Sequence, residues 1–389
     1  MSESRAARLG FWRDGNPDME MVALRLGELA VLNDVSGNDD SYRKTWSCNY
    51  SLKSHYDSVR GLGFHPVEAV LITASEDGTL KLWNLHKSGG GGQAGGVSPG
   101  GGQANKKSAA AGDLEPVYTC RGHSGPVLCL CMSHTGDACY SGSLDGTIRC
   151  WSLPSPNIDP YDTFDASVLT DVLVGHGDSV WSIAVHSSDN RIASAGADGS
   201  VRLWEPGNTA QNMIRKFIPD SDEGVPTSVD FVNTDPGQLL AAYTSSAAFI
   251  YDLETGKPVI SFESKEEHPA NSKGQINQIV SHPTLPITIT AHEDRFIRFF
   301  DNNTGKMIDC MVAHLDAVSC LSIDPNGLYL MSGSHDCSIR LWNLDNKTCI
   351  QEITAHRKKF DESIFSVAFH PSRPLLASAG ADGVVKVFV

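Results

Sequence analysis

Histidine, aspartate and serine recur together along this chain, and hydrolases combine these residue types in catalytic triads. His314 precedes Asp336 by 22 residues, and Trp342 follows the aspartate six residues later. The same spacing occurs in three further sets: His55, Asp77 and Trp83; His123, Asp145 and Trp151; His176, Asp198 and Trp204. A catalytic site is single and needs an exposed nucleophile beside an oxyanion pocket. Because this set repeats from segment to segment, we interpret it as a structural device and predict no catalytic residue.

The same residues could also bind a metal, but the pattern does not favour it. A zinc site needs three or four ligands that converge on one point. Each repeat offers one histidine and one carboxylate, which we expect to engage each other. The ten cysteines include no Cys-x-x-Cys pair, and Cys129-x-Cys131 comes closest. We therefore predict no metal and no cofactor.

A glycine-rich stretch invites a nucleotide-binding interpretation, which the details oppose. Gly101–Ser108 ends in Lys-Lys-Ser, as a phosphate-binding loop does, but Lys106 stands where the second glycine is required. No strand leads into the stretch and no helix follows it. We interpret residues 88–112 as a flexible insertion.

Charge and composition narrow the function classes. The 31 Lys and Arg against 46 Asp and Glu leave a net charge of −15, which disfavours nucleic-acid binding because that affinity depends on cations meeting phosphates. The N-terminus lacks the apolar core of a signal peptide, and no apolar run approaches the ~20 residues that span a bilayer. Free cysteines without a disulfide pattern are typical of a reducing compartment. These features predict a cytoplasmic protein.

The elements that position the repeated residues are β-strands. In the first unit, strands are expected at Val59–His65, Val70–Ser75 and Thr79–Leu85, with an Asp-Gly hairpin turn between the second and third. Seven such units of three strands, each with an outer fourth strand, can be counted. His356 and Asp382, 26 residues apart, belong to the seventh, which ends on its third strand.

Ring closure is the economical solution, because Trp46–Leu52 is a surplus strand that can complete the last unit and remove an exposed edge. We predict an all-β fold: a seven-bladed β-propeller over residues 45–389, closed by an N-terminal strand. A short tail, residues 1–44, is expected to be mostly disordered.

The repeated Gly-His or Ala-His dipeptides, turn aspartates and Trp-Asn-like strand ends resemble WD repeats, which build β-propellers. The resemblance implies a hydrogen-bonded chain of histidine, aspartate, a strand hydroxyl and tryptophan inside each blade. The matching hydroxyls are Ser75, Ser143 and Ser334. Gly196 and Gly380 stand at this place in blades three and seven, so we expect incomplete networks there. Blade four lacks the repeated histidine and turn aspartate, and blade five keeps Asp294 with Phe300 at the aromatic place. We expect both blades to depend more on apolar packing.

The same resemblance places the second residue of each first strand near the rim of the central channel. The seven candidates for a protein-binding rim are Arg60, Leu128, Trp181, Asp230, Asn277, Ser319 and Phe365. Tryptophan and arginine are enriched among binding hot spots. The alternative is that Trp181 and Phe365 merely pack between blades. Arg357, Lys358 and Lys359 form a basic cluster, either a solvated loop or a contact for an acidic partner.

Several short sequence segments are similar to the C-terminal propeller of the striatin family. They are Ser281-His-Pro-Thr-Leu-Pro-Ile, Ala291-His-Glu-Asp-Arg, Asp301-Asn-Asn-Thr-Gly-Lys, Ala355-His-Arg-Lys-Lys-Phe and Asn157-Ile-Asp-Pro-Tyr-Asp. The resemblance covers residues 45–389, and the Gly-rich insertion suggests one member in particular. Striatins are scaffold subunits that assemble protein phosphatase 2A with germinal-centre-type kinases, a Mob-family protein and adaptors.

Family members also carry a coiled coil and segments that bind caveolin and calmodulin. Residues 1–44 show no sustained heptads and no basic amphipathic helix. We therefore expect the phosphatase and calmodulin attachments to lie outside this chain, which looks like a fragment or short form.

These observations predict a non-catalytic protein-docking module of a striatin-like scaffold that regulates kinase signalling. It would lie in the cytoplasm or reach membranes through its partners. An enzyme using the propeller mouth would need convergent carboxylates or histidines at the channel, and the seven candidates include only Asp230. A further alternative is a propeller that binds peptides, as a substrate or histone-tail receptor does.

Overall fold

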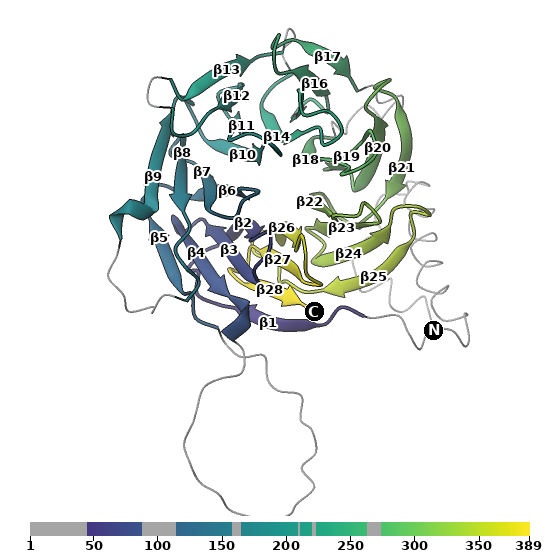
Figure 1. The fold of residues 1–389 in the computed structure, drawn as a ribbon. Helices are drawn as coiled ribbons and strands as arrows, with labels where there is room; N and C mark the ends of the chain where they lie inside the picture. Colours follow the sequence, from purple (N-terminus) through teal and green to yellow (C-terminus); the bar gives the residue numbers. More distant parts are fainter. Residues whose placement is uncertain (1–44, 88–113, 158–164, 209–210, 220–222, 263–273) are drawn as a thin grey trace, which may run out of the picture. The chain divides into compact units, whose positions relative to one another are not determined.

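Seven four-stranded antiparallel sheets stand around a central axis and form a β-propeller (Figure 1). The computed structural model describes residues 45–87, 114–157, 165–208, 211–219, 223–262 and 274–389. The predicted tail, residues 1–44, and the predicted insertion, residues 88–112, lie outside the described residues. Trp46–Val389 forms one compact unit. The fold class predicted from the sequence is confirmed.

The sheets are called blades one to seven, and each runs from an inner strand at the axis to an outer strand. Blade one consists of β2 (Val59–Phe64), β3 (Val70–Ser75), β4 (Thr79–Asn84) and β5 (Tyr118–Arg121). Blade two consists of β6 (Val127–Met132), β7 (Ala138–Ser143), β8 (Thr147–Ser152) and β9 (Leu169–Val174). Blade three consists of β10 (Val180–Val185), β11 (Ile192–Gly196), β12 (Val201–Trp204) and β13 (Met213–Phe217). Blade four consists of β14 (Pro226–Phe231), β15 (Gln238–Tyr243), β16 (Ala248–Asp252) and β17 (Pro258–Ser261).

Blade five consists of β18 (Ile276–Ser281), β19 (Ile287–His292), β20 (Phe296–Asp301) and β21 (Met307–Val312). Blade six consists of β22 (Val318–Ile323), β23 (Tyr329–Ser334), β24 (Ser338–Asn343) and β25 (Cys349–Thr354). Blade seven consists of β26 (Ile364–Phe369), β27 (Leu376–Gly380), β28 (Val385–Phe388) and β1 (Cys48–Leu52). Two 3-10 turns, η2 (Leu85–Lys87) and η3 (Ala166–Val168), are the only helical elements of the described residues.

The turn between the second and third strands of each blade needs a residue with positive φ. Glycine supplies it where the sequence has Asp-Gly, as at Gly78 (φ 78°). Blades four, five and six place Ser246, Arg295 and Cys337 in the same left-handed region, with φ of 72°, 77° and 74°. The turn is therefore kept by the flanking strands even where its favoured residue is missing.

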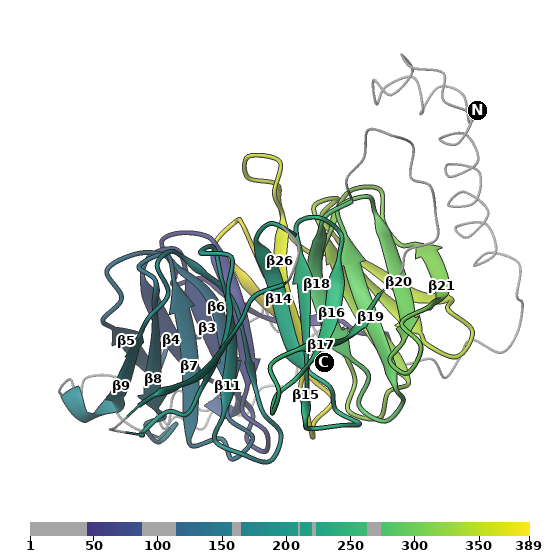
Figure 2. The same cartoon turned by 90° about the horizontal axis from the view of Figure 1, so that it is seen from above.

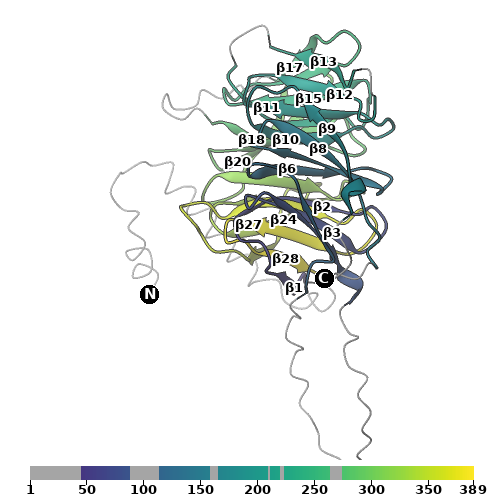
Figure 3. The same cartoon turned by 90° about the vertical axis from the view of Figure 1, so that its left-hand side faces the viewer.

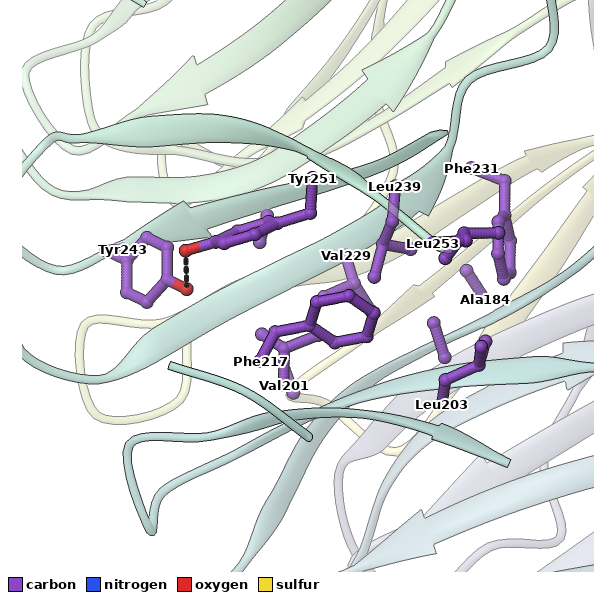
Figure 4. Packing of buried hydrophobic residues seen from close by; sticks show 13 residues of the cluster. Ala184, Val201, Leu203, Phe217, Val229, Phe231, Leu239, Tyr243, Tyr251 and Leu253 are labelled. Carbon is purple, nitrogen blue, oxygen red and sulfur yellow. Dashed lines mark hydrogen bonds between the residues drawn. The ribbon is translucent and has the colours of Figure 1, made fainter. Parts of the chain in front are cut away.

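Apolar side chains bury themselves between neighbouring blades. Each of the seven hydrophobic clusters joins two adjacent sheets, so the core is a closed series of interfaces. Figure 4 shows the cluster between blades three and four, where Phe217 packs with Val229 and Leu239. The second strand of blade one, β3, is wholly buried because neighbouring sheets cover both of its faces.

The ring closes where β1 pairs antiparallel with β28, with Leu52 opposite Val385 (Figures 1 and 3). The backbones of Ser47 and Val389 also exchange two hydrogen bonds. Trp46 and the side chain of Gln351 in blade six form a reciprocal pair, 2.9 Å each way. The predicted closure by the N-terminal strand is confirmed.

Candidate functional site

A hydrogen-bonded chain runs through blade one from aspartate to tryptophan. His55 Nδ1 lies 2.9 Å from an Asp77 carboxylate oxygen, and its Nε2 lies 2.7 Å from Thr73 Oγ1. Trp83 Nε1 donates to the same hydroxyl at 3.0 Å. The carboxylate only accepts, so Nδ1 carries the proton and Nε2 accepts from the hydroxyl. The ring nitrogens of His55, the hydroxyl of Thr73 and the indole N–H of Trp83 therefore all have hydrogen-bond partners.

The linking hydroxyl lies two residues before the predicted one, which corrects Ser75, Ser143 and Ser334. The residues that bond both histidine and tryptophan are Thr73, Ser141, Ser194 and Ser332. Strand register explains this, since Trp83 lies opposite Leu71 and reaches Thr73, two residues along the same face. Ser75 lies at the turn, where it accepts from the Asp77 N–H.

The networks of blades three and seven, predicted to be incomplete, are therefore largely intact. His176 contacts Asp198 at 3.1 Å and Ser194 at 2.7 Å, despite Gly196. In blade seven His356 contacts Asp382 at 3.0 Å and Ser378 at 2.7 Å. Blade seven lacks only the bond from tryptophan to the hydroxyl, because Phe388 occupies the tryptophan position and has no N–H to donate.

Blades four and five use other pairs. In blade four the hydroxyls of Tyr243 and Tyr251 are hydrogen-bonded, with 3.0 Å between their oxygens. The pair lies among buried apolar residues (Figure 4), in agreement with the prediction that this blade depends more on apolar packing. Blade five departs from that prediction. Its Arg298, 1% exposed, makes two hydrogen bonds to Asp294, and His292 bonds Thr290 at 2.8 Å. A charged pair thus replaces the histidine–aspartate link.

The histidine–aspartate–hydroxyl sets have triad distances but cannot act as triads. Ser141 and Ser332 are 0% exposed, so no substrate can reach their hydroxyls, which the tryptophan N–H groups also engage. Burial lowers the pKa of His123 and His314, and the aspartates oppose this only in part. Burial would raise the pKa of Asp145, but hydrogen bonds from Thr147 and His123 hold it well below its usual range.

Each inner strand opens with a β-bulge, and the bulged residues converge on one place. The ladder register shifts at the second residue of every inner strand. The seven bulged residues are Arg60, Leu128, Trp181, Thr227, Asn277, Ser319 and Phe365. All of them line a cavity of about 870 Å³, here called the mouth, at one end of the central channel. A bulge re-aims a side chain, which explains their common direction.

Asp230 is the one predicted rim residue that does not line the mouth. In blade four the bulge follows Pro226, so Thr227 takes the rim position and Asp230 lies three residues further along β14. There it accepts N–H groups from Phe231 and from Ser281 of blade five. Burial raises the pKa of Asp230 to about 7. Proline in a sheet favours the first residue of a strand or a bulge. Pro226 was therefore the sequence signal that would have identified Thr227 as the rim residue of blade four.

Aromatic and charged side chains define the chemistry of the mouth. The Arg60 guanidinium carbon lies 3.7 Å from the centre of the Phe365 ring, and Arg60 Nε lies 2.6 Å from Glu76. His335 meets the same ring edge-on. Trp181 is 43% exposed. Phe365 thus packs within the mouth, whereas Trp181 is open to solvent.

The basic cluster belongs to the loop between β25 and β26, which extends beyond the strand ends in yellow in Figure 2. Lys358 pairs with Asp316 of blade six at 2.9 Å, and Lys359 pairs with Asp57 of blade one at 2.6 Å. The two lysines therefore already have acidic partners within the chain. Arg357 donates its backbone N–H to Asp382.

Among the described residues, no group of three or more His, Cys, Asp or Glu side chains is arranged to hold a metal ion. The helices found there are too short to cross a membrane.

Comparisons with known proteins agree with this geometry. The family model for the WD domain, G-beta repeat, matches residues 46–84, 114–152, 167–205, 305–343 and 347–388. Most of blades four and five, whose networks are altered, lies in the unmatched interval between residues 205 and 305.

Curated relatives extend the likeness across the whole propeller. Striatin-3 of Mus musculus is 53% identical over 384 residues, covering 96% of this chain and 46% of the relative. Striatin of Rattus norvegicus is 52% identical and striatin-4 of Mus musculus 50% identical, each covering 94% of this chain and 46% of the relative. These identities do not separate the members, and the chain spans about half the length of these relatives. The chain belongs to the WD-repeat family, and its ring is a striatin-family propeller.

Proposed function

We propose that this propeller is a non-catalytic docking module of a scaffold that assembles protein phosphatase 2A with germinal-centre-type kinases, a Mob-family protein and adaptors. The observation that carries the proposal is the mouth, where one bulged residue from every blade meets and Trp181 stands exposed. The striatin resemblance supports the choice of partners. The module would act in the cytoplasm and reach membranes through its partners.

The mechanism is geometric. A ring whose seven interfaces are all buried is rigid, so its loops hold partners at fixed separations. Tethering raises the effective concentration of one bound partner near another without any new chemical step. The buried hydroxyls of the blade networks supply rigidity and no nucleophile.

The test is affinity purification from cells of the wild-type chain and of Trp181→Ala and Phe365→Ala variants, probed for a germinal-centre-type kinase and a Mob-family protein. Truncating a central aromatic anchor typically weakens binding by about 2 kcal/mol or more, so we expect at least one partner to be lost. Leu328→Ala is the matched control, because Leu328 is 47% exposed in the turn before β23, at the opposite end of the strands. Equal recovery with all three folded variants would refute docking at the mouth.

A further inference from the structure

The mouth has the character of a docking surface for a peptide. It encloses about 870 Å³, and its lining includes Trp181, Leu128 and Phe365 beside polar groups. Two further aromatic side chains stand exposed in the loops that lead into inner strands on the same face: Tyr56 is 95% exposed and Phe360 is 91% exposed. Exposed aromatic side chains around a cavity are typical of interaction sites.

Arg60 shows how the mouth holds a guanidinium group. Its side chain stacks on Phe365, and its nitrogens face two carboxylates, Glu76 at 2.6 Å and Glu362 at 3.6 Å. An aromatic face with flanking carboxylates is the arrangement that suits arginine, since the planar cation stacks and pairs at once. The protein therefore already contains one such arginine site, which its own Arg60 occupies.

The other charged side chains that line the mouth are acidic, as far as the structure describes it. Asp178, Glu293 and Asp361 line it, and no ion pair involves any of the three among the described residues. Of the described residues that line the mouth, Arg60 is the only Lys or Arg, and it is already paired. The pKa of the lining His335 is lowered by burial, so it adds no positive charge at neutral pH.

The unpaired carboxylates are held in place by their neighbours. Asp178 accepts the N–H of Ser179 at 2.6 Å, and Glu293 accepts the side-chain amide of Asn277 at 2.9 Å. Trp181 follows Asp178 by three residues on the same loop and strand, so an exposed aromatic side chain and an unpaired carboxylate come from one segment.

We propose that the mouth binds an arginine-bearing, partly apolar segment of a partner protein. The arginine side chain would meet the unpaired carboxylates and Trp181, and the apolar side chains would pack on the exposed aromatic residues. Nucleic acid is disfavoured because its phosphates would meet the same carboxylates. This proposal rests on the proposed docking function and narrows the chemistry of its partner.

The experiment measures fluorescence anisotropy of labelled synthetic peptides with the purified chain. One peptide alternates Arg and Leu, and its control alternates Glu and Leu. The mouth variant carries Asp178→Asn, Glu293→Gln and Asp361→Asn. These substitutions keep hydrogen-bond acceptors, and asparagine tolerates the φ of 68° at position 361. The matched control variant carries Asp137→Asn, Glu254→Gln and Asp345→Asn, exposed acids in loops at the opposite end of the strands. Both variants change the net charge equally.

We expect the Arg-Leu peptide to bind the wild-type chain and the control variant alike, and the mouth variant about tenfold more weakly, with affinity falling as salt rises. Equal losses in both variants would mean attraction to the net negative charge alone and would overturn the proposal. Binding of the Glu-Leu peptide as tight as that of the Arg-Leu peptide would also overturn it.

The two proposals can fail separately. If the kinase or the Mob-family protein depends on Trp181 but is retained by the mouth variant, the docking function stands and the arginine-bearing segment is excluded. If neither the Trp181→Ala variant nor the mouth variant loses a partner or a peptide, both proposals fall.

Discussion

At the scale of single residues, one hydroxyl links the polar network of each of blades one, two, three and six. Ser141 donates to His123 and accepts from Trp151, although Ser143 stands nearer the aspartate in sequence. Two buried partners depend on it, and an unsatisfied buried polar group costs about 1–3 kcal/mol. The hydroxyl therefore contributes more to stability than its small size suggests.

Replacing Ser141 by alanine should lower the free energy of unfolding by about 1–3 kcal/mol, because it leaves the His123 and Trp151 nitrogens without partners. Denaturant unfolding followed by tryptophan fluorescence measures the change. Ser124→Ala is the control, since this exposed hydroxyl makes only a long contact to Asp145, 3.4 Å. Equal stability of the two variants would show that the link through Ser141 is not stabilising.

At the scale of elements, the strand β1 decides whether the ring is closed. It pairs with β28 and contributes Leu52, 1% exposed, to the core between blades seven and one. Without it, β28 would present unpaired N–H and C=O groups, which promote pairing with other chains. Because the blades form a closed ring, loss of one interface between blades also exposes the faces of both blades that formed it.

Deleting Trp46–Leu52 should therefore lower the melting temperature sharply and produce soluble aggregates, as seen by calorimetry and size-exclusion chromatography. A chain that begins at Thr45 keeps β1 and serves as the control. If the deleted chain melted at the same temperature as this control, closure through β1 would contribute nothing to stability.

At the scale of the whole molecule, the repeated networks couple stability to pH. The pKa values of His55, His123, His176 and His314 are lowered, by burial first, below the ordinary value of 6.5. The folded state then binds fewer protons than the unfolded state, so stability falls as pH drops through 6.5. The lowered pKa values of the partner aspartates add a second loss as pH drops below 3.8. Asp230 opposes the first step, because its raised pKa favours the folded state at lower pH.

In an Asp230→Asn variant, urea midpoints measured between about pH 8 and pH 3 should accordingly be level above about pH 7, decline below about pH 6.5 and decline again below about pH 4. In the wild-type chain the titration of Asp230 opposes the first decline, so its midpoints should fall less between about pH 7 and pH 5 than those of the variant. Midpoints that rise steadily from pH 8 to pH 5 in that variant would contradict neutral, buried histidines.

Sequence alone determined the number of blades, the closing strand and the loss of the histidine–aspartate link in blades four and five, whereas its expectation of incomplete networks in blades three and seven was wrong for blade three and largely wrong for blade seven. Local spacing carries this information, because hairpin turns and alternating apolar residues act within a few tens of residues. Trp181 and Phe365 were likewise recognisable as rim residues, and the structure places both in the mouth.

Tertiary structure alone decided the contacts that depend on register and on neighbouring blades. Thr73 rather than Ser75 links the network of blade one, because the β3–β4 register sets which hydroxyl faces Trp83. Thr227 rather than Asp230 reaches the mouth, because the bulge sits at Pro226. Lys358 and Lys359 find Asp316 and Asp57 only because the ring brings blades six, seven and one together. Such pairings join residues up to 302 positions apart, and no local pattern encodes them.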